Sequence, residues 1–208
     1  MAGEELIFYI GAAIFGIATI LFGTMNARKE KPTFNVELFV SFITSLSYII
    51  MALGYATVTA PNGELVYWSR WLFYIASCSL LTTDIAHRKG LSHSKIIEVG
   101  FFTGLTMFAG FLASAVTSVD KWWFFGLSSI AYIALLFELN RGQRDRISQM
   151  PKILIFVTIT WSLFPLVWLL APTGFGLFDT FIETLLYLGL DIITKTAFGV
   201  YLYSRVKE

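Results

Sequence analysis

Seven stretches of mostly apolar residues, each long enough to cross a lipid bilayer as a helix, account for most of the chain. They cover approximately residues 5–26, 34–57, 66–86, 95–118, 121–140, 151–171 and 177–204. About 20 such residues in a helix span the hydrocarbon core of a membrane. With 56% hydrophobic and 14% charged residues, the chain is too apolar for a soluble domain of its length. The sequence predicts an all-α fold, a single domain over residues 1–208 built as a bundle of seven transmembrane helices.

The charged residues between these stretches predict an orientation in the membrane. Twelve of the 15 Lys and Arg residues fall on one side of the bundle, and only Lys121 falls in a connection on the other side. Basic connections favour the cytoplasmic side. We therefore expect an extracellular N-terminus and a cytoplasmic C-terminus. The chain begins with an acidic segment, whereas a secretory signal begins with a basic one, so the first stretch is interpreted as a retained span.

Ionisable residues inside the predicted spans are the first candidates for function, because burying a charge in hydrocarbon costs several kcal/mol. Asp191 and Lys195 lie in the segment LDIITKTAFG of the last stretch, four residues apart and hence on one helix face. One interpretation is a structural ion pair that holds the bundle together. In the other, the amine of Lys195 forms a Schiff base with an aldehyde, and Asp191 balances the positive charge.

The third stretch, YWSRWLFYIASCSLLTTDIAH, carries a stripe of functional candidates. Arg70, Phe73, Ser77 and Asp84 share one side of the predicted helix. At 1.5 Å per residue, Arg70 and Asp84 are ~21 Å apart along the axis. The predicted orientation places Arg70 toward the outside and Asp84 toward the cytoplasm. Alternatively, Arg70 anchors the helix at the membrane interface, and Asp84 caps or snorkels from a helix end.

The sixth stretch contains TWSLFPLVWLL, in which Trp161 and Trp168 are seven residues apart on one face, with Pro165 between them. Proline kinks a membrane helix and leaves a backbone carbonyl free. These residues either pack as ordinary aromatic side chains or form a flat-walled slot for an elongated apolar ligand. Tyr74 and Cys78 of the third stretch are candidates for lining the same slot.

Four segments together resemble the microbial rhodopsins over nearly the whole chain: LDIITKTAFG in the seventh stretch, WSLFPLVW in the sixth, YWSR in the third and SYIIMALGY in the second. The resemblance implies a seven-helix photoreceptor with all-trans-retinal bound to Lys195 as a protonated Schiff base and Asp191 as counterion. It also implies that Tyr48 donates a hydrogen bond to Asp191. The further residues implied at the retinal are Tyr74, Cys78, Trp161, Phe164, Pro165, Trp168 and Thr194. Of these, Phe164 replaces a tyrosine that is common in outward pumps.

Three positions in the third stretch, from which the function of microbial rhodopsins is usually read, hold Phe73, Ser77 and Asp84. Outward proton pumps carry a carboxylate at the first position. Together with the neighbouring Cys78, this triplet resembles the schizorhodopsins and the related Antarctic rhodopsins, which implies light-driven inward proton pumping. Schizorhodopsins usually have Glu at the third position, and Asp84 is one methylene shorter.

The residues also suggest why transport would run inward. Phe73 cannot accept a proton, and Arg70 is expected to keep Asp191 ionised and therefore a poor acceptor. Asp84 is then the expected cytoplasmic acceptor or attractor, reached through Ser77 and a neighbouring threonine. An acid at this position can also be the donor of an outward pump. Outward pumping and sensory photoreception are therefore alternatives, as are a light-gated channel and a transporter with a structural ion pair.

The sequence contains no phosphate loop, nucleophile motif or zinc spacing, and its single cysteine cannot form an internal disulfide. We expect an ion transporter rather than an enzyme, with no metal site and no nucleic-acid partner. The resemblance implies a multi-pass protein of a prokaryotic plasma membrane that moves protons across the lipid bilayer. It also implies a homo-oligomer, a trimer by family analogy.

Overall fold

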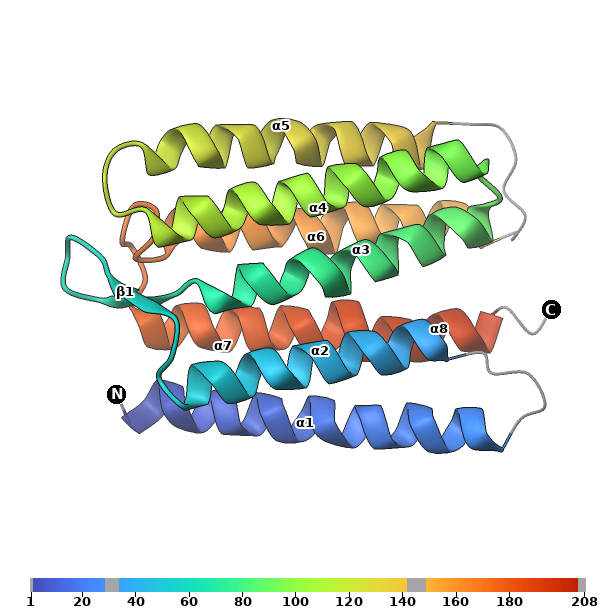
Figure 1. The fold of residues 1–208 in the computed structure, drawn as a ribbon, viewed down its shortest axis with the longest axis horizontal. Coiled ribbons are helices and arrows are strands. Elements are labelled where there is room, and N and C mark those ends of the chain that lie inside the picture. The colour runs from blue at the N-terminus through green and yellow to red at the C-terminus, as the bar shows by residue number, and fades with distance from the viewer. Residues whose placement is uncertain (1, 29–33, 142–148, 206–208) are drawn as a thin grey trace.

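The computed structural model describes residues 2–28, 34–141 and 149–205, which form seven helical rods, as predicted (Figure 1). Six rods are single helices: α1 (Ala2–Ala27), α2 (Asn35–Ala52), α3 (Ser69–Lys89), α4 (His93–Ala115), α5 (Lys121–Asn140) and α6 (Met150–Leu170). The seventh rod runs without interruption through α7 (Thr180–Asp191), the π-helix η1 (Ile192–Ala197) and α8 (Phe198–Arg205). The predicted all-α fold is therefore confirmed.

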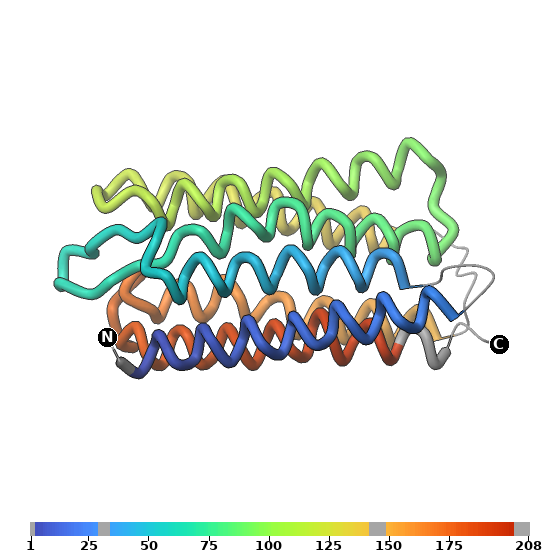
Figure 2. Tube along the Cα trace, turned by 60° about the horizontal axis from the view of Figure 1, so that its bottom comes forward, coloured from blue at the N-terminus to red at the C-terminus, as the bar shows by residue number. Residues whose placement is uncertain are grey.

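Successive rods run antiparallel along the long axis of the molecule (Figure 1, Figure 2). Helices α1 to α4 each pack against the next in sequence, and the seventh rod packs against both α1 and α6. One end of the bundle, here called the hairpin end, holds the N-terminus and a short β-hairpin (Figure 2). The opposite end, called the basic end, holds the last turn of α3 with Arg88 and Lys89, and the C-terminal end of α8.

The described helices fit a membrane environment. Five of them (α1, α2, α4, α5 and α6) are individually long and apolar enough to cross a bilayer. Helix α3 carries ionisable residues that lower its hydropathy, and α7 extends for only 12 residues before the π-helix. Large apolar side chains face outward, among them Ile133 at 66% exposure and Phe137 at 60%. Helices suit the hydrocarbon region of a bilayer because their backbone N–H and C=O groups bond to each other within the helix.

The connection between α2 and α3 differs from the prediction. The second apolar stretch was predicted to extend to residue 57, but α2 ends at Ala52, and β1 (Thr57–Thr59) pairs antiparallel with β2 (Leu65–Tyr67). Gly54 and Ala56 have φ angles of 70° and 58°, in the left-handed region that a continuing helix cannot adopt. The third helix likewise begins at Ser69 rather than near residue 66. Both predicted boundaries failed because strands of only three residues are too short to show a periodicity that differs from that of a helix end.

Candidate functional site

The two opposite charges of the seventh rod meet inside the bundle. Lys195 Nζ lies 2.8 Å from Asp191 Oδ1, and the two side chains are 3% and 0% exposed. A buried charge needs both a partner of opposite sign and hydrogen bonds to offset its lost hydration. Asp191 and Lys195 are this pair: each balances the charge of the other in the interior of the bundle.

Two tyrosines complete the surroundings of Asp191. Tyr48 on α2 donates its hydroxyl to Asp191 Oδ2 at 2.9 Å, the contact that the resemblance implies. Tyr74 on α3 donates its hydroxyl between the two carboxylate oxygens, 2.7 Å from each. The sequence predicts Tyr74 only as a wall of a ligand slot, so this hydrogen bond is a further contact that the sequence does not predict. Asp191 is thus held by groups from three rods.

The lysine lies in an irregular part of its helix. Ile192–Ala197 form a π-helix, and Thr194, inside this segment, donates its hydroxyl to the Leu190 carbonyl at 2.7 Å. Short π-helical segments are rare and occur often at functional sites. The segment LDIITKTA contains neither glycine nor proline, so no local signal in the sequence predicts the change of helix type.

Arg70 is buried on the hairpin-end side of this ion pair. Its guanidinium carbon lies 4.3 Å from the centroid of the Tyr187 ring and 6.0 Å from that of Tyr48. Its Nη2 atom is 3.8 Å from the Met51 sulfur. Among the described residues Arg70 forms no ion pair with Asp191, and the Tyr48 side chain contacts both. Any influence of Arg70 on Asp191 therefore acts through space rather than through a direct contact.

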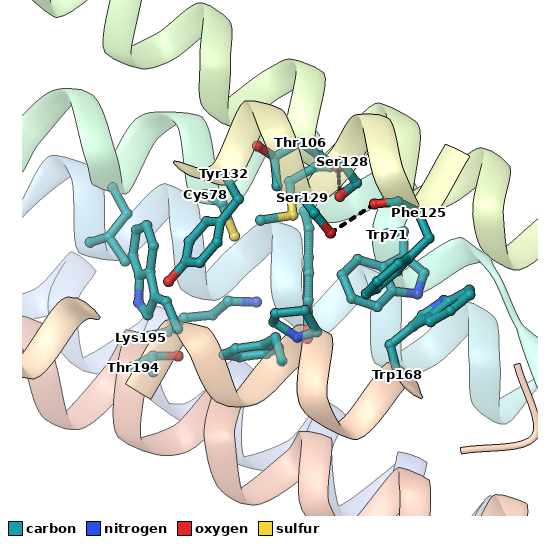
Figure 3. Close-up of a pocket in the computed structure, with 17 residues that line it drawn as sticks. Trp71, Cys78, Thr106, Phe125, Ser128, Ser129, Tyr132, Trp168, Thr194 and Lys195 are labelled. Carbon is teal, nitrogen blue, oxygen red and sulfur yellow. Dashed lines mark hydrogen bonds between the residues drawn. The ribbon is translucent and has the colours of Figure 1, made fainter. Parts of the chain in front are cut away.

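A cavity lined by Lys195 lies between α3, α4, α5, α6 and the seventh rod. Figure 3 shows the Lys195 amine among the lining side chains, with Trp71, Phe125 and Trp168 gathered on the side away from Thr194. The walls are mainly aromatic, and Phe125 stacks on Trp168 with ring centroids 4.5 Å apart. Of the residues expected around a ligand, those that line it are Tyr74, Cys78, Trp161, Phe164, Pro165, Trp168, Thr194 and Lys195.

The Lys195 amine is underused as a hydrogen-bond donor. Despite its approach to Asp191, it makes no aligned hydrogen bond with any described residue, and it lies 3.7 Å from the centroid of the Tyr74 ring. An ammonium group carries three donors, and leaving them unpaired in the interior is costly. An imine to an apolar aldehyde would keep one N–H for the carboxylate and place the apolar chain in the cavity. The residues fit such a ligand.

The polar side chains from Ser77 to Thr83 on α3 donate mainly to backbone carbonyls of their own helix. Ser77 donates to the Phe73 carbonyl at 3.1 Å, and Thr83 donates to the Ser79 carbonyl at 2.8 Å. The Thr82 hydroxyl is within hydrogen-bond distance of the Cys78 carbonyl, at 3.0 Å. The Thr82 hydroxyl is also 2.9 Å from the Thr103 hydroxyl of α4, but among the described residues no side-chain hydrogen bond connects Ser77 with Asp84.

Two of the expected α3 residues are placed as follows. The Phe73 side chain is partly buried and lies outside the cavity lining. Asp84 lies near the basic end, where Arg88 Nε donates to its Oδ2 at 2.5 Å. The Asp84 side chain is only 12% exposed, so this ion pair is largely shielded from solvent.

Two residues of the basic end were missed by the sequence interpretation. Arg88 was counted only as a loop charge, although its spacing of four from Asp84 predicts an ion pair on one helix face. Glu37 on α2 was not considered, although it is an acid within the second apolar stretch. It is 2% exposed, and its Oε1 lies 4.0 Å from Arg88 Nη2.

Known proteins share this architecture and sequence. A family model described as bacteriorhodopsin-like protein matches residues 2–207. Sensory rhodopsin I of Haloarcula marismortui is 29% identical over 206 residues, which cover 95% of this chain and 85% of the relative. Bacteriorhodopsin of Halobacterium salinarum is 28% identical over 212 residues, covering 93% and 80%. The crystal structure of schizorhodopsin 4 matches with a TM-score of 0.87 and 36% identity, covering 96% of this chain and 98% of that one.

Proposed function

We propose, from the premise that this chain belongs to the bacteriorhodopsin-like family of microbial rhodopsins, that it is a light-driven inward proton pump. Membership makes it a multi-pass membrane protein of a retinal-binding family that includes pumps and sensors. The proposal adds that all-trans-retinal binds Lys195 and that Asp191 is its counterion. It also places the hairpin end outside, the basic end in the cytoplasm and a homo-oligomer, by analogy a trimer, in a prokaryotic plasma membrane.

The cavity supports the cofactor assignment. Retinal, bound as an imine to Lys195 Nζ, would supply light absorption and a change of shape that reorients the N–H bond. Trp161, Pro165 and Trp168 would hold it between apolar walls, which also exclude water from the amine. Asp191 would balance the positive charge at Nζ, since its Oδ1 is already 2.8 Å away.

The observation that carries the direction is the ion pair of Asp84 with Arg88 at 2.5 Å. In this ion pair Asp84 is the negatively charged partner of Arg88. It can therefore accept a proton, whereas the donor of an outward pump must begin with one. Asp84 is proposed as the group that receives or attracts the Nζ proton on the basic side.

The opposite direction lacks a suitable acceptor. Phe73 stands where outward pumps carry a carboxylate, and its ring has no site for a proton. Asp191 is close to Nζ, but the hydroxyls of Tyr48 and Tyr74 already donate to its oxygens, and in this proposal it stays at the amine as the counterion. The 36% identity to schizorhodopsin 4 supports applying the implied inward transport to this chain.

Light-induced pH changes test this function. Cells that express the protein with all-trans-retinal are illuminated in unbuffered suspension, and external pH is recorded. We expect a rise that a protonophore abolishes and that is absent for Lys195→Ala, which forms no pigment. Asp84→Asn should keep its colour and lose net proton uptake. The matched control Asp120→Asn, an exposed acid at the hairpin end, should pump like the wild type.

The other outcomes are equally informative. A protonophore-sensitive fall in external pH would establish outward pumping and make Asp84 a donor. Normal uptake by Asp84→Asn would remove Asp84 from the mechanism. A current that reverses with membrane voltage would indicate a channel.

A sensory photoreceptor is the second candidate, favoured by the 29% identity to sensory rhodopsin I. A coloured sample with no pH change and a long-lived photoproduct would support it.

A further inference from the structure

Glu37 is a buried acid with no role in the mechanism described so far. It lies in the first turn of α2, and its side chain is 2% exposed. Its Oε2 has no hydrogen-bond partner among the described residues. The side chain fills a space that exists because α8 has a glycine there: a Cβ added at Gly199 would lie 2.6 Å from Glu37 Cγ. Gly199 therefore leaves room for the Glu37 side chain between α2 and α8.

Arg88 links this acid to Asp84. Its Nε lies 2.5 Å from Asp84 Oδ2, while Nη2 is 4.0 Å from Glu37 Oε1. The neighbouring Lys89 forms no ion pair with either acid, and its Nζ is directed to the α5 side, where it donates to the Leu139 carbonyl at 2.6 Å. Within the described part of the basic end, two largely buried carboxyl groups thus share one guanidinium.

Two carboxyl groups, Asp84 and Glu37, to one guanidinium, Arg88, favour a state in which the two acids together hold one proton. Two carboxylates beside a single guanidinium would leave one uncompensated negative charge in a poorly hydrated site. Asp84 has the closer contact with Arg88 and is the carboxylate. Glu37, which is more distant and has one oxygen without a partner, is the group left to carry the proton.

We propose that Glu37 is protonated in the dark and releases its proton to the cytoplasm when Asp84 becomes protonated, a role that rests on the proposed inward pumping. The proton from Lys195 Nζ binds Asp84 and neutralises it. Arg88 then loses its partner and turns toward Glu37, which becomes a carboxylate and loses its proton to water at the basic end. The cycle closes when Asp84 passes its proton to Glu37 and pairs with Arg88 again. One proton enters the cluster and one leaves in each cycle.

Infrared spectroscopy tests the dark state independently of transport. The light-minus-dark spectrum of the wild type should contain a negative band in the carbonyl region of protonated carboxyl groups, shifted in deuterium oxide. Glu37→Gln should lose this band while keeping its colour. Glu98→Gln, an exposed acid of the same end that pairs with Lys95 at 2.5 Å, should keep the band. Persistence of the band in Glu37→Gln would overturn the proposal.

The timing of proton release tests the second half. A pH-sensitive dye at the cytoplasmic surface should report release in the wild type together with Asp84 protonation. In Glu37→Gln this early release should be lost, and the proton should appear only when Asp84 is deprotonated. Inward pumping with unchanged release in Glu37→Gln would refute this role alone. Outward pumping by the wild type would refute the proposed function, and the infrared band would still decide whether Glu37 is protonated.

Discussion

The hydroxyl of Tyr74 should stabilise the buried ion pair, and Tyr74→Phe isolates its contribution. The substitution keeps the ring and removes only an oxygen that lies 2.7 Å from both carboxylate oxygens of Asp191. A hydrogen bond to a charged group contributes about 1.5–3 kcal/mol net. Because the ring stays, no large cavity term is added. We therefore expect a loss of about 2 kcal/mol in the stability of the site.

Thermal decay of the pigment in the dark measures this loss. If the hydrogen bond is broken at the barrier to decay, 2 kcal/mol corresponds to decay about 30-fold faster at a fixed temperature. Tyr48→Phe should accelerate decay by a smaller factor, since its single hydrogen bond to Asp191 is longer, at 2.9 Å. The double variant should show a non-additive effect, because both hydroxyls serve one carboxylate.

Tyr132→Phe is the matched control. Tyr132 also lines the cavity, but its hydroxyl is 3.1 Å from the Ser162 hydroxyl, in an exposed position away from any charge. Its removal should leave the decay rate close to that of the wild type. Equal decay rates for Tyr74→Phe and Tyr132→Phe would refute the reasoning, because the hydroxyl on Asp191 would then contribute nothing to stability.

Three further substitutions test other parts of the structure. Lys89→Met should lower the free energy of unfolding by about 2–4 kcal/mol, since the buried amine donates to two carbonyls at the C-terminal end of α5, at 2.6 and 3.3 Å; a melting temperature equal to that of the exposed control Lys152→Met would contradict this. Arg88→Gln should form pigment and lose most light-driven proton uptake, so full uptake would show that the ion pair is dispensable. Gly199→Ala should displace the Glu37 side chain, which its Cβ would approach to 2.6 Å, and shift the Glu37 infrared band; an unchanged band would argue against this contact.

Most of the fold could be predicted because membrane helices are encoded by length and hydropathy. Helices α1, α4, α5 and α6 begin and end within a few residues of the apolar stretches. The hairpin between α2 and α3 could not be recognised, because its strands have only three residues each and lie next to the helical stretches. Its cause is the left-handed backbone at Gly54 and Ala56, and the alanine carries no sequence signal for that conformation.

The site was predictable in part for a related physical reason. Asp191 and Lys195 stand out because charges are rare in apolar stretches and because their spacing of four places them on one helix face. The contacts of Tyr74 with Asp191 and of Glu37 with Arg88 required three-dimensional information. The hydroxyl of Tyr74 on α3 bonds to Asp191 on the seventh rod, and the proximity of Glu37 to Arg88 depends on how α2 packs against α3. Helical periodicity shows which residues share one face of a helix. It does not show which residues of another helix that face contacts.

The two acids on either side of the proposed proton transfer have different surroundings. Asp191 lies at the amine and accepts hydrogen bonds from two tyrosine hydroxyls, and neither tyrosine offers a second carboxyl group. Asp84 lies near the basic end, and its partner Arg88 has a second carboxyl group within 4.0 Å, at Glu37. Protonation of Asp191 would leave its tyrosines without a charged acceptor, whereas protonation of Asp84 leaves Arg88 with another acid to pair with. In the proposed inward transfer, Arg88 can therefore exchange Asp84 for Glu37 as its partner when Asp84 receives the proton.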